Sequence, residues 1–167
     1  PLMADSWVIF DPIYQVEGAA VHWRWIKEWL KEYDHNLRVR QLVGALVPAQ
    51  AYYKAQKLRE LVRQQVRDAL ATYDVLILPT SKSCAPRLVD DTEITSKEMA
   101  ASLIPVMTRP FNLASVPALS INCGFNSQGL PIGLQIGGRP FAEETVLKVG
   151  HAYEQNTLWH DLRPPNL

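Results

Sequence analysis

Cysteine is scarce in this chain of 167 residues, with only Cys84 and Cys123. Two cysteines are too few for the disulfide framework that stabilises small secreted domains, so the sequence favours a reducing, cytoplasmic compartment. Long apolar runs are missing as well. Runs such as Val75-Leu76-Ile77-Leu78 are far shorter than the roughly 18 residues that a membrane-spanning helix needs. These absences argue against disulfide-rich and membrane-spanning proteins.

A charge excess of either sign is also lacking, because 17 basic and 17 acidic side chains cancel. Proteins that bind nucleic acid or acidic membrane surfaces usually carry a basic excess, so neither partner is predicted. Hydrophobic residues make up 47% of the chain and charged residues 20%, which is typical of a globular protein. The length suits one domain.

The sequence contains no GxSxG nucleophile motif, no phosphate-binding Walker loop and no HExxH metal motif. Its four histidines lack metal-ligand spacing and are predicted at the surface or at helix ends, and no metal site is expected. The basic residues between Lys54 and Arg67 are predicted to form a solvated helix face.

The segment Ser81-Lys82-Ser83-Cys84 places serine beside lysine, a pair that can act as nucleophile and base. It also follows a predicted strand, where α/β sheets often carry their sites. Adjacent side chains point apart, however, and no apolar residues accompany Lys82 to favour its neutral amine. A solvated loop is the preferred interpretation, and Thr80 and Ser81 remain candidates for the wall of a pocket.

Apolar spacing predicts a helix from about Gly18 to Tyr33, with Pro12 suited to a first helical turn. Core packing accounts for Trp23 and Trp29, while Trp25 lies off the apolar stripe and leaves contact with another segment open. Turn-prone residues 34–36 are predicted to end this helix.

A second helix is predicted from Pro48 to about Thr72, because apolar residues recur at steps of three and four. The apolar run at 75–78 then predicts a central strand buried between layers. Residues 80–95 have the composition of a loop, and a short helix is predicted around Ser96–Met107 with Ser96 as its N-cap.

The last third predicts a hairpin followed by a helix. Strands at 118–123 and 132–136 flank a turn at 126–129, and a helix begins at Glu143, where acidic residues suit the helix dipole. Gly137-Gly138-Arg139-Pro140 is predicted to end the second strand, with a small anion-binding nest as the alternative. Helices alternating with strands indicate an α/β fold.

Several segments, in this order and over roughly residues 36–160, resemble the C-terminal part of the amidase signature family. The clearest is Thr108–Ser120, with the sequence TRPFNLASVPALS. The supporting segments are Arg38–Arg40 with Gly44, Tyr52–Arg59, Tyr73–Thr80, Gly129–Ile136 and Phe141–Glu144.

The resemblance implies a three-layer α/β/α fold around a mixed sheet, and hydrolysis of carboxamides with no metal or organic cofactor. In that family a serine attacks the carbonyl, a second serine relays the proton to a neutral lysine, and backbone amides stabilise the oxyanion. These groups lie in a Gly/Ser-rich segment and an upstream lysine, and no Gly-Ser-Ser run occurs here. Residues 1–167 are therefore interpreted as one segment, the C-terminal portion of an amidase domain that lacks the catalytic portion and carries no catalytic residue.

The resemblance also implies a set of substrate-binding residues. Arg40 matches an arginine that amidotransferase members use to bind a substrate carboxylate, with a helix-terminal salt bridge as the alternative. Met107, Thr108 and Asn112 match the segment that approaches the substrate channel, although Asn112 is equally suited to bond the backbone of a turn. Together with Thr80 and Ser81, they form the predicted substrate wall.

The predicted function is the scaffold and pocket part of an amidase that converts a carboxamide to a carboxylate and ammonia or an amine. The missing N-terminal portion is an expected partner, and a homodimer is left open. One alternative is a non-catalytic module that binds a partner. The other is part of the A subunit of a tRNA-dependent amidotransferase, but the acidic residue of those members is absent near Ile104-Pro105-Val106.

Overall fold

The computed structural model describes residues 5–85 and 107–162. They fall into two compact units that divide within helix α3, at Val62 and Arg63. The described elements of the first unit are α1 (Ser6–Trp29), the 3-10 helix η1 (Leu30–Glu32), α2 (His35–Leu46) and the first half of α3 (Ala49–Thr72). The helix predicted at 96–107 lies outside the described residues, apart from Met107.

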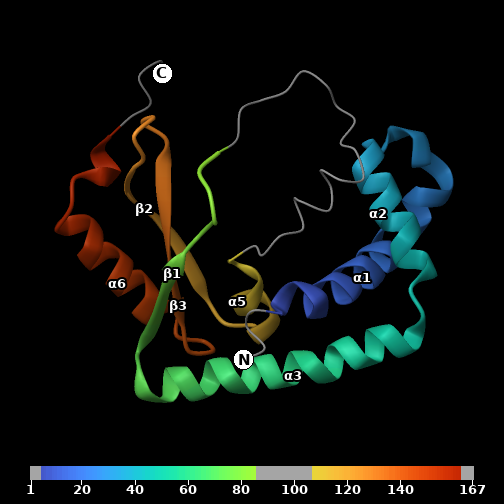
Figure 1. Ribbon diagram of the computed structural model, residues 1–167, viewed down its shortest axis with the longest axis horizontal. Helices are drawn as coiled ribbons and strands as arrows, with labels where there is room; N and C mark the ends of the chain where they lie inside the picture. Colours follow the sequence, from blue (N-terminus) through green and yellow to red (C-terminus); the bar gives the residue numbers. More distant parts are fainter. Residues whose placement is uncertain (1–4, 86–106, 163–167) are drawn as a thin grey trace. The chain divides into compact units, whose positions relative to one another are not determined.

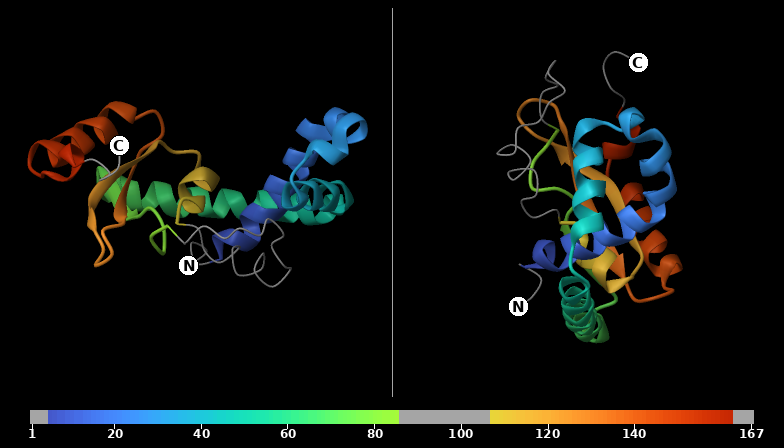
Figure 2. Two further views of the ribbon diagram at one scale, coloured as in Figure 1. Left: turned by 90° about the horizontal axis from the view of Figure 1, so that it is seen from above. Right: turned by 90° about the vertical axis from the view of Figure 1, so that its right-hand side faces the viewer.

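Helices α1 and α2 of the first unit pack side by side, as the right-hand view of Figure 2 shows. Gly44 makes this close approach possible, because a Cβ at that position would collide with the backbone oxygen of Gln15. The apolar residues that α1 buries are Ile9, Ile13, Ala19 and Ile26.

The tryptophans of α1 lie outside this buried stripe. Trp23, Trp25 and Trp29 are 48%, 44% and 57% exposed in the described structure, so the prediction that Trp23 and Trp29 are core residues is wrong for this part of the chain. The helix core is formed by smaller aliphatic side chains, and the ammonium of Lys27 lies 4.7 Å from the centroid of the Trp23 ring.

Residues 34–36 do end the first helical segment, but they also begin a second helix that the sequence did not reveal. The Asp34 carboxylate accepts hydrogen bonds from the backbone N–H groups of Asn36 at 2.9 Å and Leu37 at 3.3 Å. Aspartate favours turns and helix N-caps for the same reason, since its side chain satisfies backbone donors that lack a helical partner.

We expect Asp34→Ala to lower the free energy of unfolding by about 1 kcal/mol, the usual value of an N-cap. Asp5 is a matched control, because it stands at the N-cap of α1 and its side chain makes no capping hydrogen bond. Urea unfolding followed by circular dichroism measures both variants. Equal losses for Asp34→Ala and Asp5→Ala would show that the bonds to Asn36 and Leu37 contribute nothing.

Helix α3 confirms the strongest helical pattern of the sequence. Its buried side chains are Ala55, Val62, Val66 and Leu70, spaced by seven, four and four residues. Its C-terminal half belongs to the second unit, where the Leu70 carbonyl accepts a hydrogen bond from Arg139 Nε at 2.8 Å. Arg139 also pairs with Asp74 at 3.4 Å, which joins the segment after α3 to the end of the sheet.

The second unit contains a sheet of three antiparallel strands in the order β1-β3-β2. The strands are β1 (Val75–Pro79), β2 (Ala118–Phe125) and β3 (Pro131–Gly138). The hairpin is confirmed, and its turn places Gly129 at φ +76°, a conformation that glycine adopts without strain. All pairing among the described strands is antiparallel, whereas the resemblance implied a mixed sheet.

Among the described strands, β1 lies at the edge of the sheet and not at its centre, where its apolar run predicted it. It pairs with β3 alone among the described strands, and Ile77 is 54% exposed. The unbroken apolar run correctly predicted a strand with two apolar faces, but a run of this kind does not determine the position of a strand in the order of the sheet.

Helices cover both faces of this sheet (Figure 1). Helix α6 (Glu143–Gln155) contacts β2 and β3 on one face, and its Val146 lies against Gly138. Helix α5 (Arg109–Ala114) covers the other face, where the Phe111 ring lies over Gly137. The two glycines are the last two residues of β3, so the strand ends within the segment predicted to end it, and each glycine leaves room for a helix. The α/β fold class is confirmed.

Candidate functional site

The candidate site lies on the face of the sheet that α5 partly covers, and its polar groups depend on the strand register. Gln135 of β3 stands opposite Ser120 of β2, and the Thr80 backbone N–H donates to the Gly133 carbonyl at 2.8 Å. Residues in register across neighbouring strands point to the same face. Thr80, Ser120 and Gln135 therefore come together from three different strands or strand ends.

Gly133 lets two hydroxyl groups meet above it. The Oγ1 of Thr80 and the Oγ of Ser120 are 2.6 Å apart, and a hydrogen bond joins them. A Cβ at Gly133 would lie 2.8 Å from Thr80 Oγ1 and 3.2 Å from Ser120 Oγ. Any larger residue at position 133 would push the two hydroxyl groups apart. Because Gly133 has no side chain, the Thr80 and Ser120 hydroxyl groups form one polar surface.

Gln135 is the buried polar group of the site. It is 3% exposed, and its Oε1 finds no hydrogen-bond donor among the described residues. Most buried polar atoms in proteins have a partner, so an unpaired amide oxygen calls for an explanation. This oxygen can accept a hydrogen bond from any donor that reaches it.

Helix α5 forms the remaining wall. Thr108 is its N-cap residue, and Ser115 ends it in a left-handed conformation with φ 55°. The Ser115 Oγ accepts a hydrogen bond from Arg63 Nη2 at 2.8 Å, which ties the end of α5 to α3. Phe111 is 2% exposed, and its ring fixes α5 against β3.

These elements border an open pocket of about 340 Å³. Every described residue that lines it is uncharged. The lining residues are Thr80, Thr108, Phe111, Asn112, Ala118, Leu119, Ser120 and Gln135. The pocket thus combines an aromatic wall with hydroxyl and amide groups, which suits a neutral ligand able to both donate and accept hydrogen bonds.

The structure brings together three of the six predicted site residues, Thr80, Thr108 and Asn112. Ser81 lines a neighbouring pocket of about 540 Å³ together with Thr80 and residues 82–85 and 131–133. Met107 is half-buried just before α5 and does not line either pocket. Arg40 is half-buried on α2 in the first unit, and none of the ion pairs among the described residues includes it.

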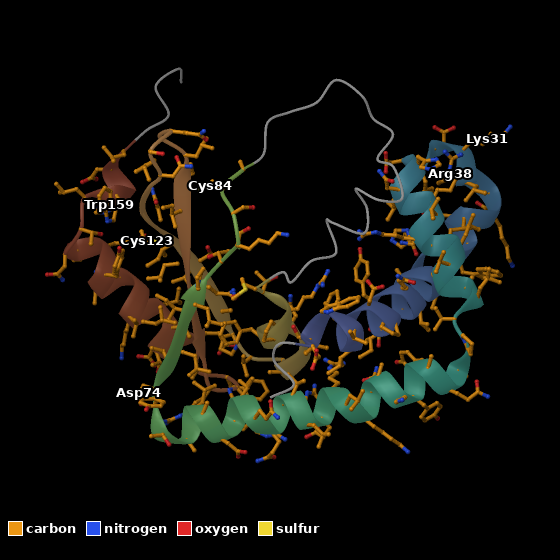
Figure 3. The ribbon with its side chains drawn as sticks, viewed as in Figure 1. Lys31, Arg38, Asp74, Cys84, Cys123 and Trp159 are labelled. Atoms are coloured by element: carbon orange, nitrogen blue, oxygen red, sulfur yellow. The ribbon has the colours of Figure 1, made fainter. Side chains whose placement is uncertain are left out.

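The Ser81-Lys82-Ser83 segment is exposed, as a solvated loop would be. The Ser83 N–H donates to Ser81 Oγ at 3.5 Å. Cys84 follows β1 and Cys123 lies on β2 (Figure 3), and both thiols are free. The described residues include no cluster of three or more His, Cys, Asp or Glu placed to share a metal ion.

Sequence reasoning missed Ser120 and Gln135. Each is a polar residue with an apolar neighbour on either side, Leu119-Ser120-Ile121 and Leu134-Gln135-Ile136. A polar residue at a position predicted to be buried points to a functional site more strongly than an exposed polar residue does. The sequence alone contains this pattern. What the sequence does not contain is the register that places the two residues opposite each other.

The second unit is thus a sheet with helices on both faces and a polar pocket between α5 and the sheet. The model of the Amidase family matches residues 10–147. The chain belongs to the amidase signature family.

Sequence relatives include the A subunit of the glutamyl-tRNA(Gln) amidotransferase of Moorella thermoacetica, which is 49% identical over 134 residues, 77% of this chain and 27% of the relative. The corresponding protein of Picosynechococcus sp. is 47% identical over 115 residues, 68% of this chain and 23% of the relative. The crystal structure of an amidase superposes with a TM-score of 0.79 at 26% identity, covering 93% of this chain and 36% of that one.

The chain spans between about a quarter and a third of the length of these relatives. Among the described residues, no helix has both the length and the apolar character that crossing a membrane requires.

Proposed function

We propose that this chain forms the C-terminal scaffold and one wall of the substrate pocket of an amidase that converts a carboxamide to a carboxylate and ammonia or an amine. One observation carries the proposal. Thr80, Thr108 and Asn112, which belong to segments that resemble the family, line one pocket together with Ser120 and Gln135, and the described lining of that pocket carries no charge. Membership of the family over residues 10–147 supports the reaction class.

In this proposal the reacting groups lie outside the chain. The nucleophilic serine, the relay serine and the neutral lysine belong to a preceding Gly/Ser-rich segment and its upstream lysine. The residues of this chain hold and orient the substrate amide, and the wall formed by α5 limits its contact with water. Positioning of this kind lowers the entropic part of the barrier without a reacting group on the wall itself.

The purified 167-residue chain is accordingly expected to show no amide hydrolysis. Ammonia release from benzamide, measured with a coupled glutamate dehydrogenase assay, should equal the rate in buffer. The protein that also includes the segment encoded immediately upstream should contain a lysine followed by a Gly/Ser-rich run, and should release ammonia. Hydrolysis by the chain alone, free of contaminating enzyme, would overturn the proposal.

A second candidate function is the A subunit of a tRNA-dependent amidotransferase. It is favoured by the curated relatives, which carry that name at 47% and 49% identity. Against it stands the sequence Ile104-Pro105-Val106, which lacks the acidic residue that the resemblance to those members implies near this position. The protein with its upstream segment would distinguish the two: hydrolysis of glutamine in preference to benzamide would favour the amidotransferase.

A further inference from the structure

The turn between β3 and α6 holds an aromatic residue in a strained backbone conformation. The Ala142 N–H donates to the Arg139 carbonyl at 3.0 Å and so closes a turn of four residues. Pro140 and Phe141 occupy its second and third positions, and Phe141 has φ 60°. Proline followed by a positive φ is the pattern of a type II turn, whose third position favours glycine. Phenylalanine is disfavoured there, because its Cβ crowds the backbone.

Packing of the Phe141 side chain does not compensate for this strain in the described structure. Phe141 is 95% exposed, so its ring lies almost entirely in water. Ser115, with φ 55°, offers a comparison, because its Oγ accepts a hydrogen bond from Arg63 within the chain. Strained residues persist where the surrounding structure requires them, and they gather at functional positions. An apolar ring that is both strained and exposed therefore calls for a contact outside this chain.

The residues on either side hold the turn in place. Before it, Arg139 Nε donates to the Leu70 carbonyl at 2.8 Å, and Arg139 Nη2 pairs with Asp74. After it, the Val146 N–H donates to the Ala142 carbonyl at 3.2 Å, at the start of α6. The ring therefore projects from a fixed base, and little backbone freedom is lost when a partner covers it.

An open pocket of about 140 Å³ adjoins the base of this turn. Its described lining residues are Arg67, Leu70, Ala71, Arg139 and Pro140. A cavity of about 150 Å³ holds one benzene molecule, so this pocket has the size of a single apolar side chain. The turn Arg139–Ala142 and this pocket together are called the Phe141 surface below. It presents a projecting ring beside a hollow.

We infer that the Phe141 surface docks the remaining part of the amidase domain. The Phe141 ring inserts into an apolar hollow of that part, and an apolar side chain of the same part fills the pocket beside the turn. The chain spans between about a quarter and a third of the length of its relatives, so those proteins contain a long further segment that can supply the contact. The inference rests on the proposed function in one respect, the placement of that segment upstream of this chain.

The small area of the Phe141 surface favours this occupant over a second copy of the chain. A stable interface between separate proteins buries roughly 800 Å² on each partner. One aromatic side chain contributes only about 150–250 Å². A segment of the same polypeptide does not need the larger area, because its covalent connection gives it a high effective concentration at the surface.

The test measures the accessibility of the Phe141 ring in two proteins, the 167-residue chain and the protein that also includes the upstream segment. Both are labelled with 4-fluorophenylalanine, and the ¹⁹F signal that is lost in Phe141→Leu identifies the ring. A soluble paramagnetic probe should broaden this signal at least threefold less in the longer protein than in the chain. Equal broadening in the two proteins would overturn the inference. Protection that grows with the concentration of the chain would indicate a second copy and would overturn it too.

Phe141→Gly should affect the stability of the two proteins differently. Glycine adopts a φ of 60° without strain, so the melting temperature of the 167-residue chain should be no lower than that of the parent. In the longer protein the same change removes a buried ring, and the melting temperature should fall by at least about 3 °C. Thermal unfolding followed by circular dichroism measures both. An unchanged melting temperature in the longer protein would contradict the inference.

Ser115→Gly is the matched control. It also replaces a residue of positive φ by glycine, but the hydrogen bond that it removes lies within the chain. Its effect on the melting temperature should therefore have the same sign in the chain and in the longer protein. If Ser115→Gly is tolerated by the chain and destabilises the longer protein as Phe141→Gly does, the contrast at Phe141 does not report docking, and the inference loses its support.

Failure of this inference and failure of the proposed function give different results. If the longer protein releases ammonia from benzamide while its Phe141 ring is as accessible as in the chain, this inference alone is refuted. If the ring is protected in the longer protein but no ammonia is released, the docking surface is supported and the proposed reaction is refuted.

Discussion

Gly44→Ala is expected to lower the free energy of unfolding by about 3 kcal/mol, the upper end of the usual cost of overpacking. The added Cβ would collide with the Gln15 backbone oxygen, and it would lie 2.6 Å from the Gln15 carbonyl carbon and 3.0 Å from the Ala19 Cβ. Because backbone atoms cannot rotate away, α1 and α2 must separate. The higher helix propensity of alanine offsets only about 1 kcal/mol of that cost.

Gly18→Ala is the matched control for this variant, since both glycines are helical and face the same pair of helices. A Cβ at Gly18 would meet the Gln41 Oε1 at 3.3 Å, and this atom is the far end of a side chain that can move. We expect a stability change within about 1 kcal/mol of the parent. Urea unfolding measures both variants, and similar losses would show that close backbone packing is not what Gly44 provides.

Gly137→Ala is the second substitution with a large expected effect. The new methyl group would lie less than 3.0 Å from three carbon atoms of the Phe111 ring. The ring is buried, and β3 is held between two strands, so neither side can yield without moving α5. We expect a loss of about 3 kcal/mol in the free energy of unfolding.

A double-mutant cycle with Phe111→Leu identifies the cause of that loss. Phe111→Leu alone should cost about 1.5 kcal/mol through lost packing. Combined with Gly137→Ala, it makes room for the methyl group, so the double variant should be more stable than the sum predicts by about 1–2 kcal/mol. Additive losses in urea unfolding would mean that the ring and the glycine are not in contact.

These substitutions bear on function because Phe111 is both a core residue and a wall of the pocket. The side chain that fixes α5 against β3 thereby sets the distance between Asn112 on the helix and Ser120 on the sheet. A variant that displaces α5 should change ligand affinity as well as stability. A change confined to the pocket, such as Gln135→Leu, should change ligand affinity without lowering stability.

Local sequence patterns predicted several elements because those patterns depend on neighbouring residues. The regular apolar spacing of residues 48–72 predicted α3, and the turn around Gly129 predicted the β2–β3 hairpin. The acidic residues at 143 and 144 predicted the start of α6. In each case the spacing of the apolar residues and the residues at the ends of the element predict the same structure. Tertiary contacts therefore did not have to override a different local preference.

Other features were missed because one local signal fits two structures. Asp34 ends one helical segment and caps the next, so the turn signal concealed α2. The apolar run of β1 predicted burial on both sides, but the position of a strand in a sheet depends on its partners. Gly137 and Gly138 were interpreted as the end of a strand, although each allows a helix to approach β3.

The sequence by itself determined the family, the principal helices and the hairpin, and it identified Thr80, Thr108 and Asn112 as candidates. It did not identify the group that completes their pocket. Thr80 and Ser120 are forty residues apart, and their hydroxyl groups meet because the strand register places both beside Gly133. The same register buries Gln135 opposite Ser120. Hydrogen bonding between strands fixes which distant residues share a face, and only the folded chain determines that pairing.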